Sequence, residues 1–407
     1  MKTKIYDVLI VGAGPAGAAS ALKLGQAGLS VAILDKAKFP RDKICGDALS
    51  VDVLNQLPLL SDDLARAFDE FALKTPSFGV KIFAPYGGFI EIPFFHSGKA
   101  KSGYICTRVD FDNLLVHHLK KTNGVSLFEN CRVNNITPGN GCLQVQTNAG
   151  TFAGKIVIGA DGAQSTVSKR IQSQQAKKKH YSAGLRVYYE GIDSFHGDNF
   201  IELYFFRETL PGYLWIFPLP HGKANVGIGM LSSVISRKKI NLKENLHQLL
   251  TTHPLLKERF HRARPIEIVK GFGLPLGSQK RKISGDRTLL VGDAAGLIDP
   301  FTGEGIGNAI RSGRVAADHI KNCFASNDFS AAFNRQYDNE IYRRMWGEFK
   351  ISKSLQGLSR SPRLFNFVVR KASQSNSIQQ LLIDALDHIG KKKLLTRPGF
   401  YYRLLFH

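Results

Sequence analysis

Residues 8–17 read VLIVGAGPAG, an apolar run that leads directly into three glycines spaced as GxGxxG. The run is typical of a buried parallel strand, and residues 18–26 have the pattern of a helix. In such a strand–turn–helix unit, Gly12 allows a tight turn, Gly14 lets a phosphate approach the backbone, and Gly17 lets helix and strand pack closely. The helix N-terminus then offers unpaired N–H groups to an anion. The segment therefore predicts a Rossmann-like unit that binds a dinucleotide.

A carboxylate eighteen residues beyond the last of these glycines supports this interpretation. Residues 29–34 predict a second strand, and Asp35 ends it, where its carboxylate could accept hydrogen bonds from both hydroxyls of an adenosine ribose. The same charge would repel a 2′-phosphate at this site. The motif by itself does not distinguish NAD from FAD.

A second glycine-rich signature lies about 280 residues later, where residues 292–305 read GDAAGLIDPFTGEG. Residues 287–291 predict the strand before it, and Asp293 could bind the ribityl hydroxyls of a flavin, which an NAD lacks. Residues 303–307 open an expected helix that runs to about Asn322. Its N-terminus could face the flavin pyrimidine ring, where negative charge gathers on reduction. Together the two signatures predict FAD.

Two shorter motifs lie between these signatures. Residues 108–112 read RVDFD and open an expected helix over residues 111–121, from which Arg108 could reach the FAD phosphates. Residues 156–162 read IVIGADG, a strand that runs into a turn at Asp161. The simpler interpretations are a surface arginine near a helix start and an ordinary Asp-Gly turn.

The order of these motifs resembles that of the p-hydroxybenzoate hydroxylase superfamily of flavoproteins, and within it the geranylgeranyl reductase family. Residues 39–47, FPRDKICGD, are similar to that family's segment around its active-site cysteine. Residues 213–229 contain its substrate-domain motif, YxWxFP followed after eight residues by GxG. The resemblance covers roughly residues 5–325.

The resemblance implies roles for particular residues. Cys45 would be catalytic, as a proton donor or as a thiol that tunes the flavin, and the alternative is a buried inert cysteine. The substrate cavity would be lined by Tyr213, Trp215, Phe217 and Pro218. The FAD-binding residues expected from the motifs and the resemblance are Gly12, Gly14, Pro15, Ala16, Gly17, Asp35, Lys36, Arg41, Cys45, Gly46, Arg108, Asp161, Gly162, Gly292, Asp293, Pro300, Gly303, Gly305 and Ile306.

The expected fold class is α/β: a Rossmann-like (GR2-type) FAD-binding domain, an inserted antiparallel substrate domain and a C-terminal helical region. Short alternating runs rich in Phe, Tyr, Val and Ile predict the antiparallel strands, which would form an apolar cavity wall. The expected boundaries are 1–75, 100–180 and 276–325 for the discontinuous FAD-binding domain, 76–99 and 181–275 for the substrate domain, and 326–407 for the helical region.

The chemistry that these motifs favour is FAD-dependent reduction of carbon–carbon double bonds in an isoprenoid or lipid substrate. The alternative is a FAD-dependent monooxygenase that hydroxylates or epoxidises an aromatic or polyene with NAD(P)H and oxygen, and a third is a flavin-binding module without turnover. Related halogenases have Trp and Ile where this chain has Tyr213 and Phe217, which disfavours halogenation. The chain contains no second GxGxxG, so NADPH or NADH would bind without its own Rossmann domain, or a carrier protein would supply electrons.

The net charge of +22 predicts an acidic partner or surface. A flavin fold disfavours nucleic acid. Residues 350–407 hold eleven Lys and Arg against two Asp, a net of +9, and residues 391–406 mix cations with aromatics and leucines. This composition favours peripheral contact with an anionic membrane, and the alternative is a helical cap with a solvated basic face.

The remaining composition bears on location and metals. The chain has no apolar run long enough to span a bilayer, and residues 7–11 already form the expected cofactor strand, so we expect neither a span nor a cleavable signal. The five cysteines form no CxxC, which suits a reducing compartment. We therefore expect a cytoplasmic protein, peripheral on the cytoplasmic face of the membrane. The histidines are scattered, so no metal site is expected.

Overall fold

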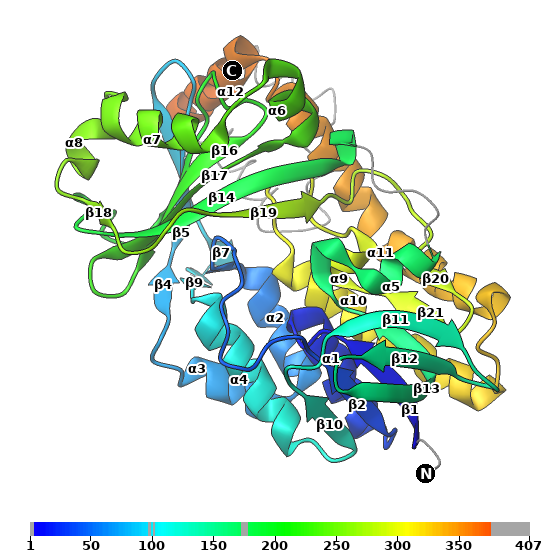
Figure 1. Ribbon diagram of the computed structural model, residues 1–407. Coiled ribbons are helices and arrows are strands. Elements are labelled where there is room, and N and C mark those ends of the chain that lie inside the picture. Colours follow the sequence, from blue (N-terminus) through cyan, green and yellow to red (C-terminus); the bar gives the residue numbers. More distant parts are fainter. Residues whose placement is uncertain (1–3, 97–98, 101, 172–177, 376–407) are drawn as a thin grey trace.

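The computed structural model describes residues 4–96, 99–100, 102–171 and 178–375. Two large sheets form the centres of two lobes, and the C-terminal helices extend from one lobe to the other (Figure 1). We call the lobe that contains the glycine-rich signatures the cofactor lobe, and the other the substrate lobe.

The sheet of the cofactor lobe has the first strand at its centre, where Val8, Leu9 and Ile10 are fully buried. This strand pairs in parallel with β2 and β13, in the order β10-β2-β1-β13-β12-β11, and β21 also pairs in parallel with β13. The strands are β1 (Ile5–Val11), β2 (Val31–Leu34), β10 (Val125–Phe128), β11 (Val133–Pro138), β12 (Leu143–Thr147), β13 (Gly150–Gly159), β20 (Ser284–Gly285) and β21 (Thr288–Leu290).

Helices that follow the motifs cover this sheet. The first helix packs against α10 and α4, and small residues such as Gly313 allow the close approach to α10. The helices of the lobe are α1 (Pro15–Gln26), α2 (Val51–Leu60), α3 (Asp62–Asp69), α4 (Arg108–Lys121), α5 (Thr166–Ile171), α9 (Gly292–Ala295) and α10 (Ile306–Ser326), with a 3₁₀ turn, η1 (Gly162–Gln164).

Several expected boundaries differ from the observed ones. Helix α4 begins at Arg108, three residues before the expected start, because the Thr107 side chain caps it by accepting a hydrogen bond from Asp110 N. Helix α1 begins at Pro15, since proline is favoured in a first turn. The expected strands at 29–34 and 287–291 are shorter, and α10 extends to Ser326.

The sheet of the substrate lobe runs β18-β14-β17-β16-β15-β5-β6, with β19 paired to β14. Its pairings are antiparallel as expected, except that β15 and β5 pair in parallel. The strands are β5 (Gly79–Phe83), β6 (Phe89–Pro93), β14 (Tyr181–Glu190), β15 (Ile201–Tyr204), β16 (Tyr213–Leu219), β17 (Lys223–Leu231), β18 (Arg264–Pro265) and β19 (Lys270–Pro275). The associated helices are η2 (Lys178–His180), α6 (Ser232–Lys238), α7 (Leu242–Thr252) and α8 (Lys257–Phe260).

Helix α7 covers one face of this sheet, where its leucines pack with Leu214, Ile216 and Ile228. The opposite face carries the odd-numbered residues of β16 and turns toward the cofactor lobe, where Trp215 and Phe217 cluster with Ile105. Short strands complete the region: β3 (Ala48–Leu49), β4 (Thr75–Ser77) and β9 (Gly103–Ile105) form one small sheet, and β7 (Phe95–His96) and β8 (Lys99–Ala100) another.

Two C-terminal helices connect the lobes, α11 (Ala331–Leu358) and α12 (Pro362–Gln374). The Tyr337 hydroxyl donates to the Leu290 carbonyl at 2.6 Å in the cofactor lobe, whereas α12 packs on β6 in the substrate lobe. The expected class, a Rossmann-like domain with an inserted antiparallel sheet and C-terminal helices, is confirmed. The exact domain boundaries stay predictions, and residues 376–407 of the expected helical region lie outside the described residues.

Candidate active site

Close packing requires two of the three glycines in the first signature, Gly12 and Gly17. A Cβ atom on Gly12 would lie 2.4 Å from the Ala160 carbonyl oxygen, and one on Gly17 would lie 1.9 Å from the Gly12 carbonyl oxygen. Gly12 also has a φ of +102°, which disfavours other residues. A Cβ on Gly14 would instead face two guanidinium groups, at 3.7 Å from Arg41 Nη2 and 4.0 Å from Arg108 Nη2. The loop therefore presents open backbone to two cations, as a pyrophosphate site requires.

One buried carboxylate holds both arginines in place. Asp112 is fully buried, and it accepts from Arg41 Nη1 at 2.8 Å and from Arg108 Nε and Nη2 at 2.7 Å each. Burial would lower the pKa of Arg108, but Asp112, and after it Cys45, raise that pKa by stabilising the guanidinium. Two cations against one anion leave net positive charge beside Gly14, which fits a bound diphosphate.

Asp35 orders the same loop from the end of β2. Its Oδ2 accepts from Ala13 N at 2.7 Å, and its Oδ1 accepts from Ala37 N at 2.9 Å. These bonds give the carboxylate a structural task besides the predicted contact with ribose. Lys36, beside it, is exposed.

The Ala-Asp-Gly turn lies against the glycine-rich loop, since Gly12 approaches both Ala160 and Asp161. The Asp161 carboxylate is engaged within its own segment, where it accepts from Thr166 N at 2.6 Å and from Ser165 Oγ at 2.5 Å. Burial raises the pKa of Asp161, and these hydrogen bonds oppose the shift. At Gly162, φ is +76° and a Cβ would meet no atom within 4 Å. The turn thus offers open backbone, while the carboxylate orders the segment that follows.

The second signature reaches the first through close packing. Gly292 lies between α1 and α10, where a Cβ would be 3.1 Å from Ala16 Cβ and 3.3 Å from Ala309 Cβ. The Asp293 carboxylate lies near Gly305, at 3.5 Å from a Cβ placed there. The structure thus brings the two ends of the predicted FAD site together.

The loop between α9 and α10 is held in place by side chains of helix α11. Asp299 Oδ1 accepts from the backbone N–H groups of residues 301 and 302 at 2.9 Å each, and Ser352 Oγ donates to Asp299 Oδ2 at 2.6 Å. Gln356 Nε2 donates to the Pro300 carbonyl at 2.5 Å. These contacts place Gly303, whose φ is +73°, ahead of Ile306, where α10 begins.

The predicted substrate strand faces the cysteine segment. A Cβ on Gly46 would lie 3.0 Å from the Phe217 ring and 3.6 Å from Trp215 Nε1, so backbone beside Cys45 packs directly on both aromatics. Cys45 is half-buried and interacts with the Arg108 guanidinium. The structure therefore places the cysteine between a predicted phosphate-binding arginine and an apolar wall.

The other two predicted substrate residues have different positions. Tyr213 donates its hydroxyl proton to the Thr302 carbonyl and lies beside Gly303, so it joins the substrate strand to the second glycine-rich loop. Burial, and then the charge of Asp299, raise the pKa of this phenol. Pro218 is buried on the opposite face of β16 from Trp215, because side chains alternate along a strand.

The GxG element of the motif makes room for the tryptophan. Trp215 pairs across the strands with Gly227, and a Cβ there would lie 2.1 Å from Trp215 Cζ2. Gly229 lies under the far edge of the same indole, at 3.7 Å. The glycines let the ring lie flat across β17.

Sequence reasoning missed residues that organise the site. Asp112 and Asp47 lie within the quoted motifs but were given no role, and Asn225 lies between the aromatic motif and GxG. Asp47 accepts hydrogen bonds from Asn225 and from Tyr188. Because these partners are up to 178 residues apart in the chain, no local sequence pattern predicts the contacts. For Asn225 the signal was a polar residue within an otherwise apolar and glycine-rich run, and for Asp112 it was the spacing of four residues from Arg108 on one helix face.

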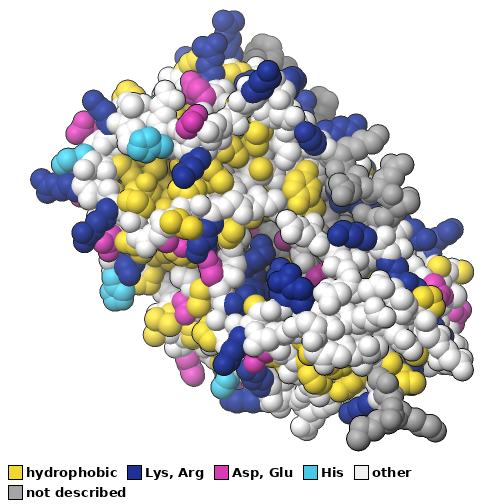
Figure 2. All heavy atoms as spheres, in the orientation of Figure 1, with side chains coloured by type: hydrophobic (Ala, Val, Ile, Leu, Met, Phe, Trp, Pro, Cys, Tyr) yellow, Lys and Arg dark blue, Asp and Glu magenta, His cyan; other side chains and the backbone are white. Residues whose placement is uncertain are grey.

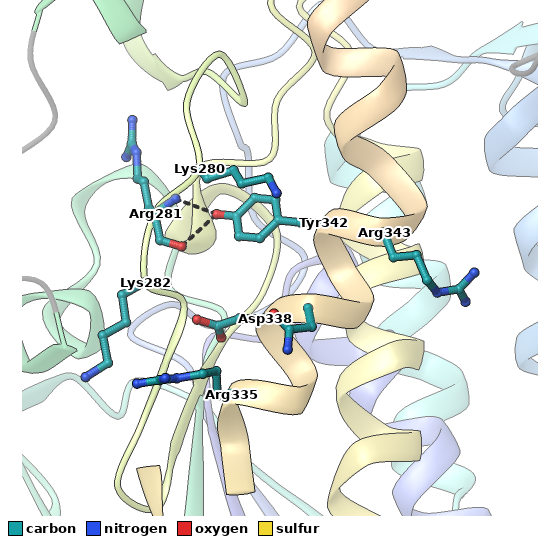
Figure 3. A pocket seen from close by; sticks show the side chains of 8 residues that line it. Lys280, Arg281, Lys282, Arg335, Asp338, Tyr342 and Arg343 are labelled. Atoms are coloured by element: carbon teal, nitrogen blue, oxygen red, sulfur yellow. Dashed lines mark hydrogen bonds between the residues drawn. The ribbon is translucent and has the colours of Figure 1, made fainter. Parts of the chain in front are cut away.

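The hollow between the lobes is bordered by lysine and arginine side chains on the face drawn in Figure 2. A separate basic pocket lies beside α11 (Figure 3), and none of the predicted site residues lines it. There Tyr342 Oη accepts from Arg281 N at 2.7 Å and donates to Arg281 O at 2.8 Å, while the Arg281 guanidinium points away from the tyrosine.

Within the described residues, no group of three His, Cys, Asp or Glu side chains is placed to hold a metal ion. In the same part of the chain, no helix combines the length and apolar character needed to cross a bilayer.

Comparison with known proteins identifies the family. Residues 5–320 match the family model described as FAD binding domain. The digeranylgeranylglycerophospholipid reductase of Methanosarcina acetivorans is 30% identical over 352 residues, which is 84% of this chain and 81% of the relative. The menaquinone reductase of Mycobacterium tuberculosis is 30% identical over 327 residues, 77% of this chain and 76% of the relative.

A solved structure agrees with these relatives. The crystal structure of a geranylgeranyl bacteriochlorophyll reductase-like protein from Thermoplasma acidophilum superposes with a TM-score of 0.80 at 26% identity, over 97% of this chain and 99% of that one. The expected FAD and the expected oxidoreductase class are thereby confirmed. The chain belongs to the geranylgeranyl reductase family of FAD-dependent oxidoreductases.

Proposed function

We propose that this protein reduces carbon–carbon double bonds in the isoprenoid chain of a lipid, with FAD as its hydride carrier. The observation that carries the proposal is the packing of the Gly46 backbone, next to Cys45, on Trp215 and Phe217, with Arg108 beside the cysteine. Two family relatives are named for a digeranylgeranyl phospholipid and for a menaquinone. Both lipids carry isoprenoid chains, so that chain is the shared feature of the substrates.

The residues of this chain suit such a substrate. Reduced FAD supplies a hydride when bound, and saturation of an alkene also needs a proton. The thiol of Cys45, half-buried at the apolar wall, is the proton donor that we propose. Trp215, Phe217 and Leu219 would pack against the hydrocarbon and exclude water, with Tyr213 at the cofactor side.

The test is anaerobic. The full-length protein is loaded with FAD, reduced with dithionite and mixed without oxygen with a digeranylgeranyl phospholipid. We expect the flavin to reoxidise and the lipid to gain two hydrogens per reduced double bond, measured by absorbance and mass spectrometry. A second sample is then exposed to oxygen; reoxidation only in that sample, with an oxygen atom found in the product, would instead establish the monooxygenase.

We propose NADPH or NADH as the electron donor, to be tested by anaerobic bleaching of the flavin by each nucleotide. We also propose a cytoplasmic location with peripheral membrane contact through the basic C-terminal region. In the described part of this region, α12 buries Phe365 and Val369 against the protein, as a helical cap would. The same helix exposes two cations, Arg363 and Arg370, which could face an anionic surface.

A further inference from the structure

The carboxyl group of Asp47 is fully buried two residues after Cys45, and donors from three separate elements converge on it. The Tyr188 hydroxyl on β14 donates to Oδ2 at 2.6 Å, and Asn225 Nδ2 on β17 donates to the same oxygen at 2.8 Å. The backbone N–H of Arg108, the first residue of α4, donates to Oδ1 at 3.2 Å. One side chain thus joins the cysteine segment to both lobes.

Asn225 extends this connection to the cysteine and to the substrate strand. Its Nδ2 also donates to the Cys45 carbonyl oxygen at 2.8 Å, and its Oδ1 accepts from Trp215 Nε1 at 2.9 Å. Asn225 is itself fully buried. A single amide therefore fixes the cysteine backbone, the Asp47 carboxylate and the indole relative to one another.

We propose that Asp47, acting with Asn225, is a positioning residue that holds the Cys45 segment in register with Trp215 and with the start of α4. The inference rests on the proposed function only in taking Cys45 and Trp215 as parts of the reductase site.

The chemistry of the site favours a carboxylate over an amide. All three partners are donors, and an ionised carboxylate accepts from every one, whereas an asparagine would direct an N–H toward one of them. The backbone of Asp47 has a φ of +65°, a left-handed conformation that Asp and Asn tolerate better than most residues. Asp47→Asn therefore removes acceptor capacity and charge without adding backbone strain.

The protonation of Asp47 gives the proposal a pH signature. Burial raises the pKa of Asp47 to about 6, although Tyr188, Asn225, Arg186 and Arg108 favour the charged form. The titratable or charged groups around it are Tyr188 and Arg186 on β14, Arg108 on α4, and Cys106. Because the buried carboxyl binds its proton more tightly than an exposed one, the folded segment is more stable below pH 6 than at neutral pH, where the three donors offset only part of the cost of burying the charge.

The test measures alkylation of Cys45 by iodoacetamide in the FAD-free, full-length protein, followed by mass spectrometry of the Cys45 peptide. Selectivity is expected because Cys45 is half-buried whereas the other four cysteines are buried. At pH 7.5 we expect Asp47→Asn to raise the rate about tenfold, the effect of losing one hydrogen bond to a charged group. The ratio of variant to wild type should rise as pH falls through 6, because protonation of the buried carboxyl stabilises the closed segment of the wild type only.

A matched pair of tyrosine variants separates positioning from general loosening of the sheet. Tyr188→Phe removes one donor from Asp47 and should also accelerate alkylation. Tyr204→Phe removes a buried tyrosine hydroxyl from the same sheet, which donates to Glu202 Oε2 and accepts from Arg259 Nη1 at 2.6 Å each, and it should leave the rate unchanged. If Asp47→Asn does not fold, by circular dichroism, this pair decides the question.

An unchanged or slower rate in Asp47→Asn or Tyr188→Phe overturns the inference, as does equal acceleration in Tyr204→Phe. Alkylation requires neither lipid nor turnover. A protein that shows the alkylation pattern but reduces no polyprenyl lipid would therefore contradict the proposed function alone.

Discussion

Asp112 illustrates how a single buried carboxylate can support a cofactor site. Its side chain is wholly inaccessible, whereas its partners Arg41 and Arg108 keep exposed fractions of 18% and 8%. Removing one partner from a buried ion pair is costly because the other charges stay desolvated. The cluster therefore depends more on this residue than on either arginine alone.

We expect Asp112→Ala to lower the free energy of unfolding by about 3–5 kcal/mol, measured by urea denaturation of the FAD-free protein. The matched control is Asp63→Ala, which breaks the exposed pair of Asp63 with Arg66 and should cost at most about 1 kcal/mol. Equal effects of the two variants would contradict the role of Asp112.

Asp47 also makes a prediction about stability. Its pKa is about 6 in the folded protein against an ordinary value of 3.8, so the folded state binds the proton more tightly. The stability from this group is complete below about pH 4 and is lost as pH rises through 6, a change of about 3 kcal/mol for such a shift. We expect the unfolding free energy of wild type minus that of Asp47→Asn to fall between pH 4 and 7. A difference that grows with pH would mean that the folded pKa is lowered instead.

Asp47 and Asn225, two of the residues that sequence analysis missed, share a physical reason, whereas Asp112 has a partner only four residues away at Arg108. The role of Gly17 could be predicted because its partner, the Gly12 carbonyl, lies within the same strand–turn–helix unit. The partners of Asp47 come from β14 and β17, 141 and 178 residues away. Such partners are chosen by the packing of the two lobes, which no local spacing encodes.

Helix α4 shows that an element's boundary can decide a residue's role. The expected start at residue 111 left Arg108 in a loop, whereas the observed cap at Thr107 makes it the first helical residue. Thr107 and Asp110 have the spacing of a capping box, so this signal was present in the sequence. The parallel pairing of β5 with β15 had no such signal, because the two strands are far apart in the chain.

The strand pair β16–β17 depends on Gly227. A Cβ there would collide with Trp215 Cζ2 at 2.1 Å and with the Leu185 carbonyl oxygen at 2.3 Å, and the carbonyl belongs to backbone that cannot move freely. We expect Gly227→Ala to cost about 1–3 kcal/mol of stability through overpacking. In a Trp346→Phe background, Trp215 emission should shift to longer wavelength as the indole leaves its buried position.

The control for this prediction is Gly197→Ala, since a Cβ on Gly197 would meet no atom within 4 Å. This variant should match the parent in both stability and emission. Parent-like behaviour of Gly227→Ala would show that the tryptophan does not need the glycine.

Across the whole molecule, α11 links the second signature to the substrate lobe. Its Tyr337 contacts β21, its Ser352 and Gln356 hold the loop at residues 299–300, and α12 then packs on β6. The sequence predicted a helical region here but no connection with the site. Helix patterns define which face is apolar, and the partner of that face depends on the assembled fold.

The basic C-terminal region gives the last prediction, at the scale of the whole chain. Residues 376–407 hold five Lys and Arg against two Asp, a net of +3, and each basic residue near an anionic bilayer contributes about 1 kcal/mol. We expect the full chain to co-sediment with phosphatidylserine vesicles more than a chain that ends at residue 375, and the difference should shrink at high salt. Replacing Lys391, Lys392 and Lys393 with Gln in the full chain should reproduce the loss. Equal binding by all three proteins would mean that the remaining cations, including those of α12, carry the contact, whereas no binding at all would favour a solvated cap.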